Sequence, residues 1–192
     1  MKRHPLLPGL YLLDLGVTVV SFYRQLFPVF ARQLYGLGAS GTGLLNTANA
    51  VGGILGAFAV FFTGRFSRKG VVTLAGTLMY AVFLIAFGFN RNFPLGLIIV
   101  GVLGMTDTLS MTMRSTIIQL TTPDKLLGRA SSIGNFVAMG ANNVGQVEVG
   151  MLSAAIGAGQ TMVLGGALSV LFVLAVWRFV PSIRKYRYTS GD

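Results

Sequence analysis

The stretch VVTLAGTLMYAVFLIAFGF, residues 71–89, carries no charged side chain. It is long enough to cross a bilayer, because a helix rises about 1.5 Å per residue and roughly 20 apolar residues span the hydrocarbon. Further apolar stretches of similar length lie on both sides of it, with short polar turns between them. We therefore predict an all-α membrane protein whose residues 1–192 form a single bundle of six transmembrane helices, at about 10–34, 42–63, 71–89, 95–120, 130–156 and 161–180.

The composition excludes most kinds of enzyme. Hydrophobic residues make up 53% of the chain and charged residues 10%, outside the range of ordinary soluble domains. There is no cysteine, and the single histidine, His4, precedes the first apolar stretch. We therefore expect no catalytic residues, no disulfide, no metal site and no cofactor. Polar groups inside the membrane or in short loops must carry the function.

The positive charge is distributed as in a membrane protein. The net charge is +10, but the basic residues fall mainly at the N-terminus, around 65–69, around 125–129 and at the C-terminus. In a six-helix protein these four places lie on one side of the bilayer. The positive-inside rule then predicts that both termini are cytoplasmic, and nucleic acid is not expected as a partner.

Four of the charged residues inside predicted helices lie on the first and fourth helices, at depths that allow them to pair. Charges in a bilayer cost at least about 2.5 kcal/mol each on insertion scales, so they are functional candidates by default. Asp14 and Arg114 lie at similar depths near the cytoplasmic side, and Arg24 and Asp107 lie near the midplane. We predict the pairs Asp14–Arg114 and Arg24–Asp107. The alternative is that these pairs only neutralise buried charge and hold the bundle together.

The predicted helix 130–156 carries a polar stripe. Asn135, Asn142 and Gln146 share one face, at spacings of seven and four residues. They are candidates for binding a polar solute, or for hydrogen bonds between helices. Glu148 points to a different face. It is either a protonatable carboxyl group or the partner of a base such as Arg24.

The order of helix types repeats along the chain. Residues 10–89 and 95–180 each consist of a charged helix, a helix rich in small residues and an apolar helix, in this order. Three-helix repeats of this kind are typical of transporters. The two apolar helices, 71–89 and 161–180, show no polar stripe and are expected at the lipid-facing periphery. Pro28 is expected to kink the first helix.

Two runs of sequence carry a resemblance to a known family. The run RSTIIQLTTPDKLLGRASS at 114–132 and the run NNVGQVEVG at 142–150 resemble the C-terminal half, spans seven to twelve, of a major facilitator superfamily transporter of the enterobactin-exporter-like branch. The basic loop 64–70 is similar to the family's cytoplasmic loop motif, without its aspartate. The loop-motif residues carried over are Gly64, Arg65, Arg68, Lys69, Pro123, Asp124, Gly128 and Arg129.

The resemblance implies one half of a secondary active transporter in the bacterial inner membrane. The first and fourth helices would line the cavity. Its partners would be the lipid bilayer, a small-molecule solute and a second six-helix half, either a separate chain or another copy of this one. Proton-coupled export of a small amphipathic or siderophore-like solute is implied, with Asp14, Asp107 or Glu148 as proton carrier. The alternatives are a non-transporting membrane subunit, a truncated transporter fragment and a simple channel.

Overall fold

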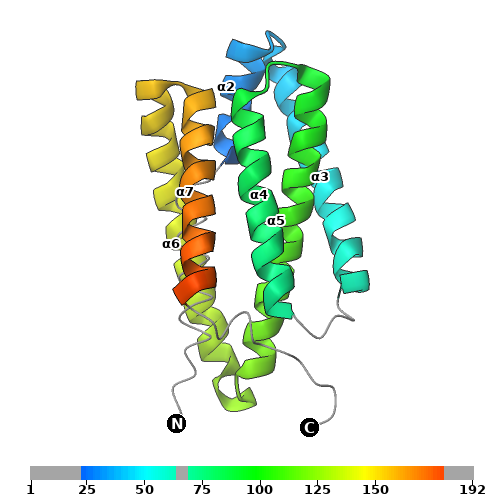
Figure 1. The fold of residues 1–192 in the computed structure, drawn as a ribbon, viewed down its shortest axis with the longest axis vertical. Helices are drawn as coiled ribbons and strands as arrows, with labels where there is room; N and C mark the ends of the chain where they lie inside the picture. Colours follow the sequence, from blue (N-terminus) through cyan, green and yellow to red (C-terminus); the bar gives the residue numbers. More distant parts are fainter. Residues whose placement is uncertain (1–22, 64–68, 180–192) are drawn as a thin grey trace.

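The computed structural model describes residues 23–63 and 69–179, and every regular element in these ranges is a helix (Figure 1). This confirms the predicted all-α class. The predicted first helix, 10–34, falls only in part within the described residues. The elements are η1 (Tyr23–Leu26), α2 (Phe27–Val29), η2 (Phe30–Leu34), α3 (Gly38–Thr63), α4 (Lys69–Phe89), α5 (Phe93–Thr121), α6 (Asp124–Ile156) and α7 (Ala158–Phe179).

Four of these helices are long and apolar enough to cross a membrane, namely α3, α4, α5 and α7. Helix α6 is the longest, with 33 residues, but does not meet this criterion. The reason lies in its amide side chains and its glutamate, which lower its hydropathy. It also begins at Asp124, earlier than the predicted residue 130, because Pro123 occupies the N-cap and only Thr122 and Pro123 separate it from α5.

The described part of the first span is broken into three short segments. A 3₁₀ turn, η1, is followed by the α-helical residues of α2, and then by a π-helical segment, η2. Pro28 lies in α2, where its missing N–H removes one backbone hydrogen bond. The helix type thus changes on both sides of Pro28, and the kink expected there stays a prediction. Segments of 3₁₀ and π geometry within a helix frequently mark functional sites.

The helices pack in the order α3, α5, α4, α7 and α6, and the first span contacts both ends of this series (Figure 1). Segments α2 and η2 lie against α3, while η1 lies against α6. Helix α4 therefore sits between α5 and α7. The sequence predicts this helix at the lipid-facing periphery, without a polar stripe. Instead half of its membrane-spanning window is buried, and it turns Thr73, Thr77 and Tyr80 inward.

Glycines bring pairs of helices to backbone contact. A Cβ atom built on Gly52 of α3 would overlap the carbonyl oxygen of Gly101 on α5. A Cβ atom on Gly88 of α4 would lie 2.6 Å from the carbonyl oxygen of Gly159 on α7. Small residues let transmembrane helices approach in this way, and close packing is a main source of their association. We call these two contact lines the α3–α5 seam and the α4–α7 seam.

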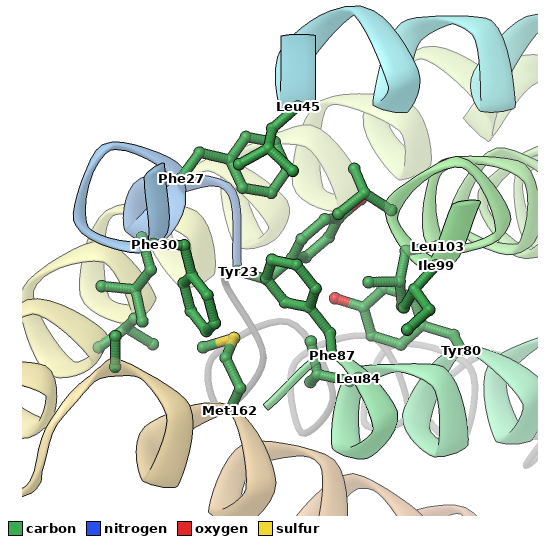
Figure 2. Packing of buried hydrophobic residues seen from close by; sticks show 14 of the residues in the cluster. Tyr23, Phe27, Phe30, Leu45, Tyr80, Leu84, Phe87, Ile99, Leu103 and Met162 are labelled. Atoms are coloured by element: carbon green, nitrogen blue, oxygen red, sulfur yellow. The ribbon is translucent and has the colours of Figure 1, made fainter. Parts of the chain in front are cut away.

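An aromatic core fills the space between the first span, α4 and α5 (Figure 2). The rings of Phe30 and Phe87 are stacked with their centroids 4.3 Å apart. Phe27 packs edge-on against the same Phe87 ring, at 6.3 Å. These side chains are fully buried, so the short first span is held in place by its aromatic residues rather than by a continuous helix.

Tight turns close the two ends of the bundle. Gly36 and Gly38 adopt positive φ between the first span and α3, and Gly157 does so between α6 and α7. These turns and the α4–α5 turn at Asn90 lie at one end, which we call the Asn90 end. The α5–α6 turn at Pro123 marks the opposite end, the Pro123 end (Figure 1).

Candidate functional site at mid-depth of the bundle

An ion pair joins the first span to α5. The guanidinium Nη2 of Arg24, on η1, donates a hydrogen bond to Oδ2 of Asp107, on α5, over 3.2 Å. Asp107 lies fourteen residues beyond Phe93, about 21 Å along α5 from the Asn90 end, near the middle of a membrane. The sequence predicted this pair from depth alone, and the structure forms it.

The pair is not enclosed by the described residues. The Arg24 side chain keeps 50% of its accessible surface and the Asp107 side chain 44%. A charged pair open to this extent at mid-depth requires polar surroundings on its open side, because hydrocarbon does not solvate ions. Water, a polar solute or another protein surface meets that requirement.

A buried hydrogen bond lies beside the pair. Asn49, on α3, donates from Nδ2 to the hydroxyl oxygen of Tyr23, and both side chains are buried. The Arg24 guanidinium carbon lies 6.0 Å from the centroid of the Tyr23 ring. Tyr80, on α4, packs edge-on against that ring at 5.8 Å (Figure 2). Tyr23 thus links three helices directly next to the Arg24–Asp107 pair.

Tyr23, Asn49 and Tyr80 are not among the site residues that the sequence predicts. Their aromatic or small polar character does not distinguish them from core residues, whereas charged residues and the amides of 130–156 stand out in an apolar sequence. An asparagine in the apolar span 42–63 is the signal that would have found this cluster, because such a side chain needs a partner in the bilayer.

Hydroxyl groups line the contact between α4 and α5 on the Pro123 side of the Tyr23–Asn49–Tyr80 cluster. Thr77 donates to the carbonyl oxygen of Thr73 over 2.8 Å, and its hydroxyl lies 3.5 Å from the hydroxyl of Ser110. Both side chains are buried. These hydrogen bonds stay within the helix pair, so the contact serves packing rather than solute binding.

The predicted polar stripe of α6 lies on one flank of that helix. Asn135 is exposed, while Asn142 and Gln146 are half-buried. Glu148 is also half-buried, on the opposite flank of the buried face, and its Oε2 atom is inaccessible to solvent and lacks a hydrogen-bond partner among the described residues. The structure therefore does not bring Glu148 together with the three amides.

Only some of the remaining predicted residues belong to the part of the chain that the structure describes. Arg114 is half-buried on α5, on the same face as Asp107, whereas Asp14 lies outside the described residues. The pair Asp14–Arg114 therefore remains a prediction. Three of the loop-motif residues also lie outside the described residues, namely Gly64, Arg65 and Arg68. Lys69 is the first residue of α4. Pro123 is the N-cap of α6 and Asp124 its first residue, and Gly128 and Arg129 are exposed near the start of that helix.

A shallow groove of about 450 Å³ lies apart from the ion pair, towards the Asn90 end. It is lined by Pro28 and Arg32 of the first span and by Gly38, Ala39 and Thr42 at the start of α3. None of the predicted site residues contributes to it. Within residues 23–63 and 69–179, no cluster of three His, Cys, Asp or Glu side chains offers a metal site.

Comparison with known proteins gives two concordant results. The sequence profile of the Major Facilitator Superfamily matches residues 1–145. The Enterobactin exporter EntS of Salmonella paratyphi A is 25% identical over 186 residues, which cover 97% of this chain and 45% of that protein. The protein of the same name from Escherichia coli O81 is 26% identical over 182 residues, covering 91% of this chain and 44% of that protein. The chain thus spans less than half the length of these curated relatives.

Proposed function

Because this chain belongs to the major facilitator superfamily, in the branch of the enterobactin exporters, we propose that it forms one half of a secondary active transporter. The transporter exports a small amphipathic or siderophore-like solute and is coupled to protons. Family membership and the apolar helices make the chain a membrane-spanning protein of the bacterial inner membrane, with the lipid bilayer as a partner. The family is one of transporters rather than enzymes.

The Arg24–Asp107 pair is the observation that carries this proposal. Two opposite charges 3.2 Å apart, each about half exposed, lie at mid-depth on the first and fourth of the six spans. Charged side chains at this depth face a bundle interior or a water-filled cavity and mark solute pathways. In the proposed transporter, the open side of the pair faces the solute pathway.

A second six-helix half completes that pathway in the proposal. A single half leaves the ion pair facing hydrocarbon, at a cost of at least about 2.5 kcal/mol per charge on insertion scales. A separate chain or a second copy of this chain removes this cost by covering the open side. The curated relatives, more than twice as long as the matched region, are consistent with a two-part assembly.

Gentle extraction from the native membrane followed by native mass spectrometry tests the assembly. A homodimer, or a complex with another six-helix chain, supports a complete pathway. A lone monomer contradicts it and favours the alternative of a non-transporting subunit or a transporter fragment.

Flux measurements test the role of the ion pair. The extracted assembly, in proteoliposomes with an imposed pH gradient, is expected to move enterobactin. Asp107→Asn is expected to abolish this flux. The swapped variant Arg24→Asp/Asp107→Arg keeps one charge of each sign and is expected to restore folding but not flux, because a solute-contacting charge is then in the wrong place. Normal flux in Asp107→Asn would contradict the proposed role.

We also propose that the Pro123 end is cytoplasmic. The basic residues Lys69, Lys125, Arg129 and Arg178 lie towards this end, whereas the described part of the Asn90 end carries only Arg32 and Arg91. The positive-inside rule favours the more basic end as the cytoplasmic one. Since the sequence contains no cysteine, single replacements report the sidedness of each end. Lys125→Cys is expected to react with an impermeant maleimide only in inside-out vesicles, and the matched variant Arg91→Cys only in intact spheroplasts. The reverse pattern would contradict this orientation.

A further inference from the structure

Asn49 is a buried amide on α3, beside the aromatic core. It keeps 7% of its accessible surface, and its Nδ2 atom donates a hydrogen bond to the hydroxyl oxygen of Tyr23. Tyr23 keeps 3% of its surface, and its ring packs edge-on against Tyr80 (Figure 2). A buried polar group that loses its partner is destabilised, so this hydrogen bond fixes the tyrosine hydroxyl against α3.

A glycine of α5 makes room for Asn49. A Cβ atom built on Gly104 would overlap the carbonyl oxygen of Asn49 and would lie 3.0 Å from its Nδ2 atom. A side chain at position 104 would therefore push α3 away from α5 and displace the amide. Gly104 lies three residues before Asp107, about one turn along the same helix. The contact at Gly104 and the carboxylate of Asp107 thus belong to one continuous helix.

Tyr23 and Arg24 are consecutive residues of η1, a 3₁₀ turn. This geometry has three residues per turn, so consecutive side chains project about 120° apart. Tyr23 is buried in the bundle, whereas the Arg24 side chain keeps half of its surface exposed. The rotation of η1 that brings the Tyr23 hydroxyl to Asn49 therefore also sets the direction of the Arg24 side chain.

These contacts form a closed path through three elements. Asn49 of α3 holds Tyr23, and Arg24 follows Tyr23 in the chain. Arg24 binds Asp107 over 3.2 Å, and α5 leads from Asp107 back to Asn49 through Gly104. An ion pair whose partners are each about half exposed does not by itself hold two side chains in one geometry. The buried hydrogen bond supplies the constraint that the exposed pair lacks.

We propose that Asn49 is a positioning residue of the solute pathway, which holds the Arg24 guanidinium in the direction of Asp107 through its hydrogen bond to Tyr23. Gly104 belongs to the same arrangement, because it lets α3 approach α5 closely enough for the amide to reach the tyrosine. Asn49 itself is buried and acts through Tyr23 and Arg24 rather than on the solute. This inference rests on the proposed function, in which the open side of the ion pair faces the pathway.

A double-mutant cycle measured in two backgrounds tests this role. Arg24→Gln and Asp107→Asn, singly and together, give the coupling of the pair from unfolding of the full chain in mixed micelles. The two losses are expected to be non-additive in the parent chain. In the Asn49→Leu background they are expected to become additive, because the guanidinium is no longer held towards the carboxylate. Full coupling in that background would overturn the proposal, and so would additive losses in the parent chain.

A second variant guards against misfolding of Asn49→Leu. Tyr23→Phe removes only the hydroxyl oxygen that Asn49 binds and leaves the ring against Tyr80, so the chain is expected to fold. The coupling between Arg24 and Asp107 is expected to be lost in this background too. A Tyr23→Phe chain that folds and keeps the full coupling would overturn the proposal.

The same helix offers a matched control. Asn46, three residues before Asn49, is exposed, and its amide donates to the Thr42 carbonyl of its own helix over 3.0 Å. Asn46→Leu makes the same chemical change without touching η1, and it is expected to leave the coupling of the ion pair intact. A loss of coupling equal to that in Asn49→Leu would overturn the proposal, since the effect would then follow from any amide of α3.

Flux separates this inference from the proposed function. In the extracted assembly in proteoliposomes, Asn49→Leu is expected to raise the enterobactin concentration at half-maximal flux about tenfold, because a misdirected guanidinium binds the solute less well. A lower maximal flux at an unchanged half-saturating concentration would overturn the proposal, since a loss of folded protein produces that pattern. The coupling does not depend on flux, so a parent assembly that moves no enterobactin would count against the proposed function alone.

Discussion

The α3–α5 seam and helix α6 are built in opposite ways. At the seam, Gly52 and Gly101 bring two backbones together, and Leu45 and Leu103 beside it are fully buried. Along α6, a Cβ atom built on Gly140 or Gly150 would meet no other helix within 4 Å, and Phe136 keeps 80% of its surface exposed. Close packing fixes the seam in one arrangement, whereas α6 has the looser packing that local movement requires. The orphaned carboxyl oxygen lies on the loosely packed helix.

Matched phenylalanine replacements give the largest expected contrast. Phe30→Ala removes a fully buried ring stacked on Phe87 and is expected to cost about 3 kcal/mol or more in unfolding free energy. Phe136→Ala, on the exposed face of α6, is expected to change that free energy little. Unfolding in mixed micelles, followed by circular dichroism, measures both. Equal losses would show that α6 is packed as tightly as the core.

Matched glycine replacements sharpen the same contrast. Gly52→Ala places a methyl group into the Gly101 carbonyl and is expected to cost about 1–3 kcal/mol, because the helices must separate. Gly150→Ala adds the same methyl group to α6 where nothing lies within 4 Å. It is expected to be neutral or stabilising by up to about 1 kcal/mol, since alanine favours helix. A larger loss for Gly150→Ala than for Gly52→Ala would reverse the comparison.

The buried Tyr23–Asn49 hydrogen bond tests how the tight region supports the ion pair. Tyr23→Phe and Asn49→Leu each remove one partner, and each is expected to cost about 1–2 kcal/mol because the other partner is left unsatisfied. A double-mutant cycle on unfolding free energy is expected to give a coupling of about 1 kcal/mol. Additive losses would mean that the two side chains contribute independently.

The smallest expected effect lies at the Asn90 end. The Asn90 amide donates to the Tyr35 hydroxyl over 2.9 Å and also to the Asn92 carbonyl, so Tyr35→Phe is expected to cost only about 0.5 kcal/mol at neutral pH.

Burial raises the pKa of Tyr35 above its ordinary value, and the folded state therefore holds this proton more tightly than the unfolded state. Its contribution to stability is complete below a pH of about 10 and is lost as the pH rises further. Tyr35→Phe is expected to unfold less steeply with rising alkaline pH than the parent chain. Parallel curves for the two proteins would contradict this.

Several features of the bundle followed from residue chemistry alone. A run such as 71–89 has to form a helix in a bilayer, because no other structure satisfies its backbone hydrogen bonds there. Depth along a helix is fixed by residue number, so the sequence predicts that Arg24 and Asp107 lie at the same depth and pair, as they do in the structure. The run 114–132 carries the family resemblance and lies within the matched region 1–145.

Other features depended on which helices become neighbours. Periodicity shows that α4 is apolar, but not that it lies between α5 and α7 with Thr77 against Ser110. Likewise, the sequence shows that Asn49 is a polar residue in an apolar span, but not that its partner is Tyr23 of the first span. A short, irregular segment is held by side-chain packing, and packing partners far apart in the chain leave no local pattern.

The sequence by itself determined the all-α membrane class, the family and the approximate depth of each charge along its helix, since these depend on local composition, on sequence motifs and on helix rise. Only the tertiary structure decided which charges are satisfied. It paired Arg24 with Asp107 and left Oε2 of Glu148 without a partner among the described residues. The physical reason is that a hydrogen bond requires two atoms within about 3 Å, and helix packing rather than residue type fixes that distance.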